Sequence, residues 1–346
     1  MGAPDRPEKA ESLRTGVSAS LVCPDTIIAD RFDHALALRN FQREASTESG
    51  EGTMKAVEIT YRYEARDTPA KPRPVDGEAA LARLGDGNRD FASLLDSLKD
   101  DNSLAQRVVQ VDPRDLGLLP GETEVPRQRP FAAILGCSDA RVPIELIFNE
   151  GPNDLFVIRV AGNGLGTEVL GSLKYAVEHL GPSLKLIVVL GHSGCGALST
   201  AVDVFLNPGD YLPLAAEHSL RNILDRLLVV VHASARGLMG FFGPDIALCA
   251  GYRQALIEAS VVTNAALAAY SIQQQMGASD QAKLRVAYGV YLLETREVWT
   301  PLLGKAKGAG LSAPPNDPVG FSELSNAIVQ SERILSLINP EPSLPR

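Results

Sequence analysis

Three side chains of the metal-binding type follow two apolar segments of similar form. Cys137 comes directly after the run Ile134–Gly136 (ILG), and His192 comes directly after the run Val189–Gly191 (VLG). Cys195 follows His192 by three residues. Thiolate and imidazole are ligands that zinc prefers, and three protein ligands leave its fourth position open to water. The pattern predicts an open zinc site at Cys137, His192 and Cys195.

Each of these residues also has a simpler interpretation. A cysteine such as Cys137 is commonly a small buried apolar side chain, and a His-x-x-Cys spacing often arises by chance. A closed structural zinc site, with Cys249 as the fourth ligand, is a further alternative. The open site is favoured because all three residues follow segments that read as buried strands, and ligands gather at the carboxyl ends of parallel strands.

A carboxylate and a guanidinium lie close behind the first cysteine. Asp139 and Arg141 stand two and four residues after Cys137. Asp139 would accept a hydrogen bond from water held at the metal, while Arg141 would orient this carboxylate and keep it ionised. Elsewhere Asp-x-Arg is usually a surface ion pair. Beside a metal ligand, the pattern favours a catalytic pair.

The elements that must position these residues alternate between short apolar runs and helical patterns. Strands are expected at 131–135, 155–160, 184–190 and 284–293, and helices at 78–98, 168–180, 252–276 and 321–338. This alternation predicts an α/β fold with a central, mostly parallel β-sheet flanked by helices. We expect an N-terminal helical arm at 78–98 and an irregular insertion at about 207–250, where proline and glycine recur.

The chain divides into three expected parts. Residues 1–77 form an N-terminal extension, partly disordered or a small accessory element, with a helical pattern at 32–45, a strand at 57–63 and a proline-containing linker at 67–76. The zinc domain is expected at 78–300, including the insertion. Residues 301–346 form a C-terminal extension that contains the last helix.

Composition restricts the classes of partner. The 346 residues carry a formal net charge of −9 with a sequence pI near 5.2, which argues against nucleic acid or an anionic membrane as a partner. The apolar stretch 227–242 is interrupted by charge and is too short to span a bilayer. Four widely spaced cysteines do not suggest a disulfide scaffold, and the polar N-terminus lacks a secretory apolar region. We expect a cytoplasmic protein.

Two motifs together resemble a known family. The run Cys137–Pro143 (CSDARVP) and the run His192–Ala197 (HSGCGA) are similar to the paired signature of β-class carbonic anhydrases, and Phe156–Asn163 (FVIRVAGN) is similar to a segment between them. The likeness covers roughly residues 80–206 well and 250–300 loosely. It implies reversible hydration of carbon dioxide to bicarbonate and a proton at the zinc site, with the Asp139–Arg141 pair controlling the reacting water.

The resemblance also implies an assembly and a substrate pocket. Members form homodimers or higher homo-oligomers, and Gln128, Phe156 and Tyr175 fall on pocket positions. By residue type alone, these would be a loop amide and two core aromatics. Ala140 and Ala161 depart from the family's usual serine and valine. The helix at 78–98 suits an arm on a neighbouring copy, although packing on its own sheet fits the periodicity equally well.

Three further questions remain open at the level of sequence. In some family members the aspartate leaves its arginine and becomes the fourth zinc ligand. The same scaffold would also suit a hydrolase of carbonyl sulfide or carbon disulfide, and the insertion at 207–250 keeps this alternative open. A non-catalytic zinc protein that binds bicarbonate or acts as a scaffold is the third alternative, and the presence of both Asp139 and Arg141 argues against it.

Overall fold

The computed structural model describes residues 56–65, 71–97, 104–119, 124–216, 218–276, 284–301 and 310–339. All of them belong to one unit, Glu48–Arg346. The helix expected at 32–45 lies outside the described residues. The expected domain boundaries therefore stay a prediction.

A five-stranded sheet forms the centre of the fold. Its strands lie in the order β4 (Leu155–Arg159), β3 (Ala132–Gly136), β5 (Leu186–His192), β6 (Arg285–Tyr291) and β7 (Val298–Trp299). The first four are parallel and β7 is antiparallel to β6, which confirms the mostly parallel sheet. Every residue of β3 and β5 is buried, and this explains why both read as continuous apolar runs.

The order of the strands creates a switch point in the sheet. From β3 the chain passes to β4 on one side and then crosses to β5 on the other side of β3. The connections therefore leave the carboxyl ends of β3 and β5 in opposite directions. In open parallel sheets such a point opens the crevice in which ligands bind. Cys137 and His192 lie at these two strand ends.

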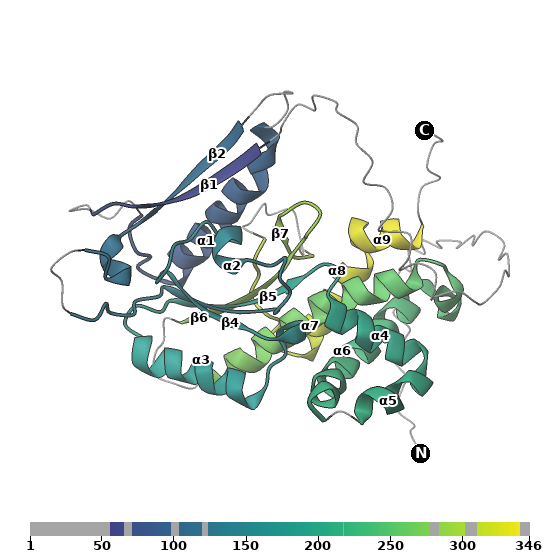
Figure 1. Cartoon of the computed structure of the whole chain (residues 1–346). Helices are drawn as coiled ribbons and strands as arrows, with labels where there is room; N and C mark the ends of the chain where they lie inside the picture. Colours follow the sequence, from purple (N-terminus) through teal and green to yellow (C-terminus); the bar gives the residue numbers. More distant parts are fainter. Residues whose placement is uncertain are drawn as a thin grey trace, which may run out of the picture. The chain divides into compact units, whose positions relative to one another are not determined.

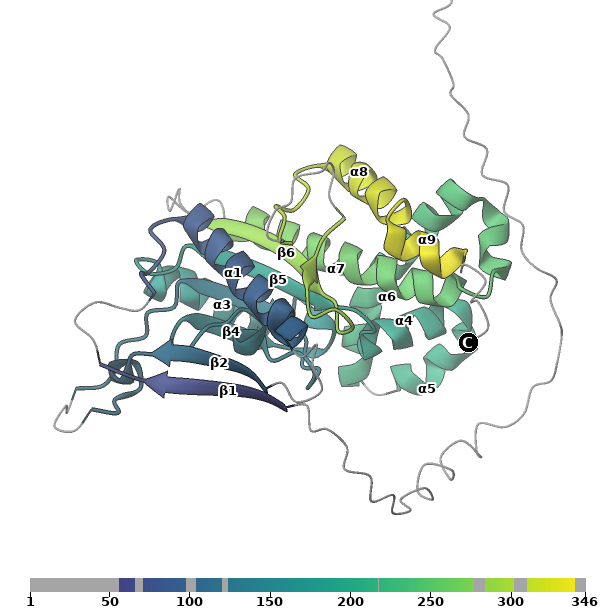
Figure 2. The same ribbon diagram turned by 90° about the horizontal axis from the view of Figure 1, so that it is seen from above.

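Helices cover both faces of the sheet (Figures 1 and 2). On one face, α1 (Gly77–Ala92) and α2 (Ile144–Ile147) share a buried apolar cluster with β3 and β5. Leu84 of α1 is fully buried in it, so α1 packs on the sheet of its own chain. The other face carries α3 (Thr167–Leu180) and α7 (Tyr252–Met276), and α7 approaches β5 at Gly191.

Among the described residues, α7 is the one helix long and apolar enough to cross a membrane by length and composition, and 78% of its most apolar window is buried inside the fold. It contacts β5, β6, α4 (Gly196–Leu206) and α6 (His218–Phe242). Because its apolar surface is already covered by protein, α7 is a core helix of this domain.

The segment 207–250 differs from the irregular insertion that was expected. It contains η4 (Pro208–Asp210), α5 (Tyr211–Ala215), the 25-residue helix α6 and η5 (Pro244–Leu248). The expectation was wrong because Pro208 and Pro244 begin short helical turns, while Gly237 and Gly240 lie inside α6 without breaking it. Between these two prolines, Leu224, Leu227, Val231 and Leu238 recur at helical spacing and are buried, where α6 packs against α4 and α7.

The strand expected at 57–63 is confirmed as β1 (Ala56–Tyr63). It pairs in parallel with β2 (Leu104–Val111), which the sequence did not reveal. Short 3₁₀ turns follow α1 and β2 at η1 (Ser93–Ser97) and η2 (Pro113–Leu116). The single helix expected at 321–338 is two helices, α8 (Pro318–Val329) and α9 (Glu332–Ile338). Ser331 separates them, because its side chain accepts a hydrogen bond from Ile334 N and so begins a new helix.

Candidate metal centre

The three predicted ligands lie where two strands end and one helix begins. Cys137 follows β3 directly, His192 is the last residue of β5, and Cys195 is the N-cap of α4. The glycines before the first two ligands have a steric reason. A Cβ at Gly136 would lie 2.5 Å from the side chain of Ile144, and one at Gly191 would lie 3.1 Å from Val261. A larger residue at either position would force its neighbour to shift, so glycine lets both strand ends pack closely against helices.

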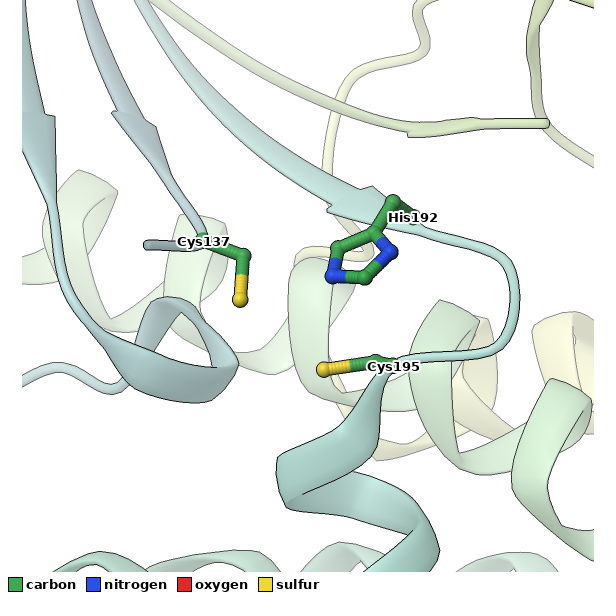
Figure 3. A group of neighbouring side chains, drawn as sticks. All are labelled: Cys137, His192 and Cys195. Carbon is green, nitrogen blue, oxygen red and sulfur yellow. The ribbon is translucent and has the colours of Figure 1, made fainter. Parts of the chain in front are cut away.

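The three side chains converge. Their ligand atoms all lie within 4.8 Å of one another. Figure 3 shows both sulfur atoms and one ring nitrogen turned toward the same space between the strand ends. All three residues are buried, with His192 fully inaccessible. The structure thus brings together the three residues that the sequence singled out.

The hydrogen bonds of His192 leave one nitrogen available to a metal. Its Nδ1 lies 3.0 Å from the carbonyl oxygen of Ser193, so the tautomer that suits this contact carries the proton on Nδ1. Nε2 is buried and has no hydrogen-bond partner. A buried polar atom without a partner is unfavourable. A metal at Nε2 would satisfy it, with Nδ1 held by the backbone as in many metal-binding histidines.

The contact between the two thiols shifts their pKa values in opposite directions. The hydrogen bond with Cys195 lowers the pKa of the Cys137 thiol, while the same contact and then burial raise the pKa of Cys195. Cys137 is thus the more acidic of the two thiols, and a divalent cation would displace the proton that remains on Cys195. Zinc bonds sulfur at about 2.3 Å and imidazole nitrogen at about 2.0 Å. The donor set and its spacing fit zinc.

The alternative of a closed site with Cys249 is not supported by the described residues. Cys249 is the C-cap residue of η5, ahead of α7, and it is not a member of the metal-binding group. Asp139 is not a member either. Three protein ligands leave one position open for a small molecule.

Asp139 and Arg141 form the expected pair beside the ligands. Arg141 donates to the Asp139 carboxylate three times, from its backbone N (2.9 Å), from Nε (3.0 Å) and from Nη2 (2.7 Å). These bonds hold the pKa of Asp139 well below its usual range. Asp139 Oδ2 lies 3.9 Å from His192 Nε2. An ionised carboxylate thus stands next to the ligand nitrogen.

The chain contains a second Asp-x-Arg pair of the same geometry. Arg114 donates to Asp112 from its backbone N (3.0 Å), Nε (2.9 Å) and Nη2 (2.7 Å). Asp112 caps η2, in the segment between β2 and β3, and is not a member of the metal-binding group. The local motif therefore forms the same ion pair in both places. Only its position beside the ligands distinguishes Asp139–Arg141.

The sequence analysis did not identify two residues that hold the ligand segments. One binds the segment after β3, and the other lies in the turn after His192. Arg159, at the end of β4, donates from Nε to the carbonyl of Cys137 (3.0 Å) and from Nη2 to the carbonyl of Asp139. Ser193 accepts from His192 through its carbonyl. A signal for Arg159 was present, because it is the one charged residue at the end of an apolar strand in a parallel sheet.

The predicted pocket residues lie in less enclosed positions. Gln128 is exposed in the segment before β3, Phe156 is half-buried on β4, and Tyr175 is 48% exposed on α3. Tyr175 stacks on His179, with ring centroids 4.5 Å apart. Within the described residues, no hydrogen bond or ring contact joins the three to the metal ligands. Their roles in binding substrate stay predictions.

A family model described as carbonic anhydrase matches residues 132–298, which run from the start of β3 into β7 and include all three ligands. This part of the chain, just under half of its length, is similar to carbonic anhydrases. The matched region does not include β1, β2, α1 or the two C-terminal helices.

The similar proteins cover only part of the chain. "Carbonic anhydrase 2" of Mycobacterium tuberculosis is 43% identical over 100 residues, 28% of this chain and 47% of that protein. "Carbonic anhydrase" of Pseudomonas aeruginosa is 49% identical over 78 residues, 21% of this chain and 34% of that one. The alignments thus span half or less of these relatives. A Coccomyxa β-carbonic anhydrase in complex with acetazolamide has a TM-score of 0.40 and 22% identity, over 68% of this chain and 90% of that chain.

Proposed function

We propose that this protein is a zinc-dependent carbonic anhydrase that hydrates carbon dioxide reversibly to bicarbonate and a proton. The observation that carries the proposal is a buried set of two thiols and one imidazole with an ionised carboxylate beside it. Cys137, His192 and Cys195 would hold the metal. When bound, zinc acts as a Lewis acid that acidifies water to give a nucleophile near neutral pH.

Asp139 would orient the reacting water. Because Arg141 keeps this carboxylate ionised, it can accept a hydrogen bond but cannot donate one. Its Oδ2, beside His192 Nε2, would accept a hydrogen bond from the reacting water and so direct a lone pair of the water oxygen at the carbon of the substrate. Arg141 fixes the carboxylate through two side-chain hydrogen bonds, so the acceptor is in place before the substrate arrives.

The proposal includes the form of the site in which Asp139 stays with its arginine. The carboxylate lies on Arg141 and outside the ligand group, which leaves the fourth position to a small molecule. The carbonyls of Cys137 and Asp139 are held by Arg159. A turn of Asp139 toward the metal would break its bonds to Arg141, while Arg159 would still hold the backbone.

Gln128, Phe156 and Tyr175 would complete the pocket in a homodimer or higher homo-oligomer. Two of them, Gln128 and Tyr175, are exposed on a single chain, which suits residues that a second copy covers. Phe156 would supply an apolar wall for carbon dioxide, and Gln128 would donate to a substrate oxygen. A cytoplasmic location is part of the proposal, because a reducing compartment keeps thiols available to a metal.

Stopped-flow carbon dioxide hydration by the purified full chain, with a parallel zinc assay, tests the proposal. We expect about one zinc per chain and hydration that disappears in Cys137→Ser. Full zinc without hydration would favour a scaffold instead. Faster turnover of carbonyl sulfide or carbon disulfide than of carbon dioxide would identify the site as a hydrolase for the sulfur analogues.

A further inference from the structure

The turn between His192 and Cys195 is held by a network that reaches the C-terminal helix α9. Ser193 and Gly194 form this turn, Glu258 on α7 and Glu294 after β6 bind it, and Arg333 on α9 joins the two glutamates. We call these five residues the turn network. Arg333 lies outside the residues that match the carbonic anhydrase family.

Ser193 is fixed on every side. Its backbone N donates to the carbonyl of Tyr291 (2.9 Å), and its Oγ accepts from Leu293 N (2.9 Å) and donates to Glu294 Oε2 (2.8 Å). Its carbonyl is the group that holds Nδ1 of His192. The position of Ser193 therefore sets the direction of the ligand nitrogen Nε2.

Glu258 fixes the next residue of the turn. Its Oε1 accepts from Gly194 N at 3.1 Å, and its side chain is only 4% exposed. Gly194 has a φ of +60°, a conformation that glycine adopts without strain. Gly194 stands directly before the ligand Cys195. A buried carboxylate thus holds the backbone between the two ligands.

Arg333 forms ion pairs with both glutamates. Its Nη2 lies 2.7 Å from Glu258 Oε2 and its Nε donates to the same oxygen at 2.9 Å, while Nη1 pairs with Glu294 Oε1. The Arg333 side chain is 22% exposed. Without it, Glu258 would be a buried carboxylate with no cationic partner among the contacts described. A buried carboxylate without a cationic partner destabilises the fold, and we expect the turn that Glu258 binds to shift.

We propose that Arg333 is a positioning residue for the metal centre, through which helix α9 holds the turn that carries His192 and Cys195. This gives the C-terminal segment a role in metal binding. Groups that orient metal ligands from behind typically change metal affinity or activity 10- to 100-fold when they are lost. The inference rests on the metal site of the proposed function, but its test reads zinc release and needs no turnover.

A chromogenic chelator removes zinc from the zinc-loaded full chain, and the rate of removal measures how firmly the turn positions the metal ligands. For Arg333→Met we expect zinc to leave about tenfold faster or more, by the magnitude that such partners typically show. Arg253→Met is the matched control. Arg253 forms a two-point ion pair with Asp203 (2.7 and 2.8 Å) on the exposed sides of α7 and α4, and its loss should leave the rate unchanged.

Two further variants separate positioning from simple packing of α9. Ile338→Ala removes a buried side chain of the same helix and should lower the melting temperature with the zinc release rate unchanged. Glu294→Ala, at an exposed position, removes the acceptor of Ser193 without threatening the fold. It should speed zinc release several-fold and alter the visible spectrum of the cobalt-substituted protein.

The outcomes are separable. Release from Arg333→Met and Glu294→Ala at the wild-type rate, with unchanged cobalt spectra, would overturn the inference and leave the proposed function standing. If Arg333→Met does not fold, Glu294→Ala alone decides. A wild-type chain that binds no zinc would overturn the proposed function together with this inference.

Discussion

Replacing Asp139 with asparagine separates the chemistry of the site from its architecture. The change keeps the size of the side chain but removes its charge and one of its two acceptor oxygens. In the wild type, Oδ1 accepts from the backbone N and Nε of Arg141, and Oδ2 accepts from Nη2 and lies 3.9 Å from His192 Nε2. An amide nitrogen in place of Oδ2 can no longer accept a hydrogen bond from the reacting water.

The expected loss follows from the hydrogen bond to a charged acceptor. Such bonds contribute about 1.5–3 kcal/mol, and each 1.4 kcal/mol is roughly a factor of ten in rate. We expect kcat/KM for carbon dioxide hydration to fall roughly 10- to 150-fold. Stability should change by less than about 1 kcal/mol, because Arg141 is 61% exposed and water screens the ion pair. Zinc content should stay full.

The chain offers an internal control for this variant. Asp112→Asn breaks an Asp-x-Arg pair with the same three hydrogen bonds, away from the ligands. Stopped-flow hydration should be unchanged in Asp112→Asn. Wild-type kcat/KM in Asp139→Asn, or an equal loss in both variants, would refute the role given to Asp139.

Further predictions concern the ligand set, the pH profile and the fold. Cys249→Ser should keep one zinc per chain, whereas Cys195→Ser should lose it; a metal assay that gave the reverse would support the closed site. Activity should rise toward alkaline pH, because two thiolate ligands acidify metal-bound water less than imidazoles do. The pKa of Asp139 lies below its usual range, so protonation of Asp139 does not cause the loss of activity at lower pH. A rate maximum on the acid side would contradict this prediction. Gly87→Ala should lower the free energy of unfolding by about 1–3 kcal/mol, because the new Cβ would lie 1.9 Å from the carbonyl oxygen of Phe148. Gly171→Ala, in open space on α3, should raise it by roughly 0.5–1 kcal/mol in the same denaturant titration.

The parts of the fold that sequence predicts well are those fixed by burial. The strands β3 and β5 are almost entirely apolar and the helix α7 contains a long apolar stretch, so their limits follow from hydropathy within a few residues. The ligand set was predictable for a related reason. Glycine before Cys137 and before His192 marks the ends of buried strands, and parallel strands bring their carboxyl ends to one edge.

The parts that sequence missed depend on contacts between distant segments. The partner of β1 is β2, some 48 residues later in register. The residues of β1 alone do not indicate which strand they pair with. The helix α6 was hidden by the prolines on either side of it and by the glycines within and after it. Glu258 and Arg333, 75 residues apart, read as ordinary surface charges until the fold places them together behind the metal ligands.

X-ray absorption at the zinc edge of the purified full chain tests the central claim most directly. The account predicts two sulfur donors and one imidazole nitrogen, from Cys137, Cys195 and His192, with one further oxygen donor. Three or more sulfur donors, or a chain that takes up no zinc when it is supplied, would contradict it.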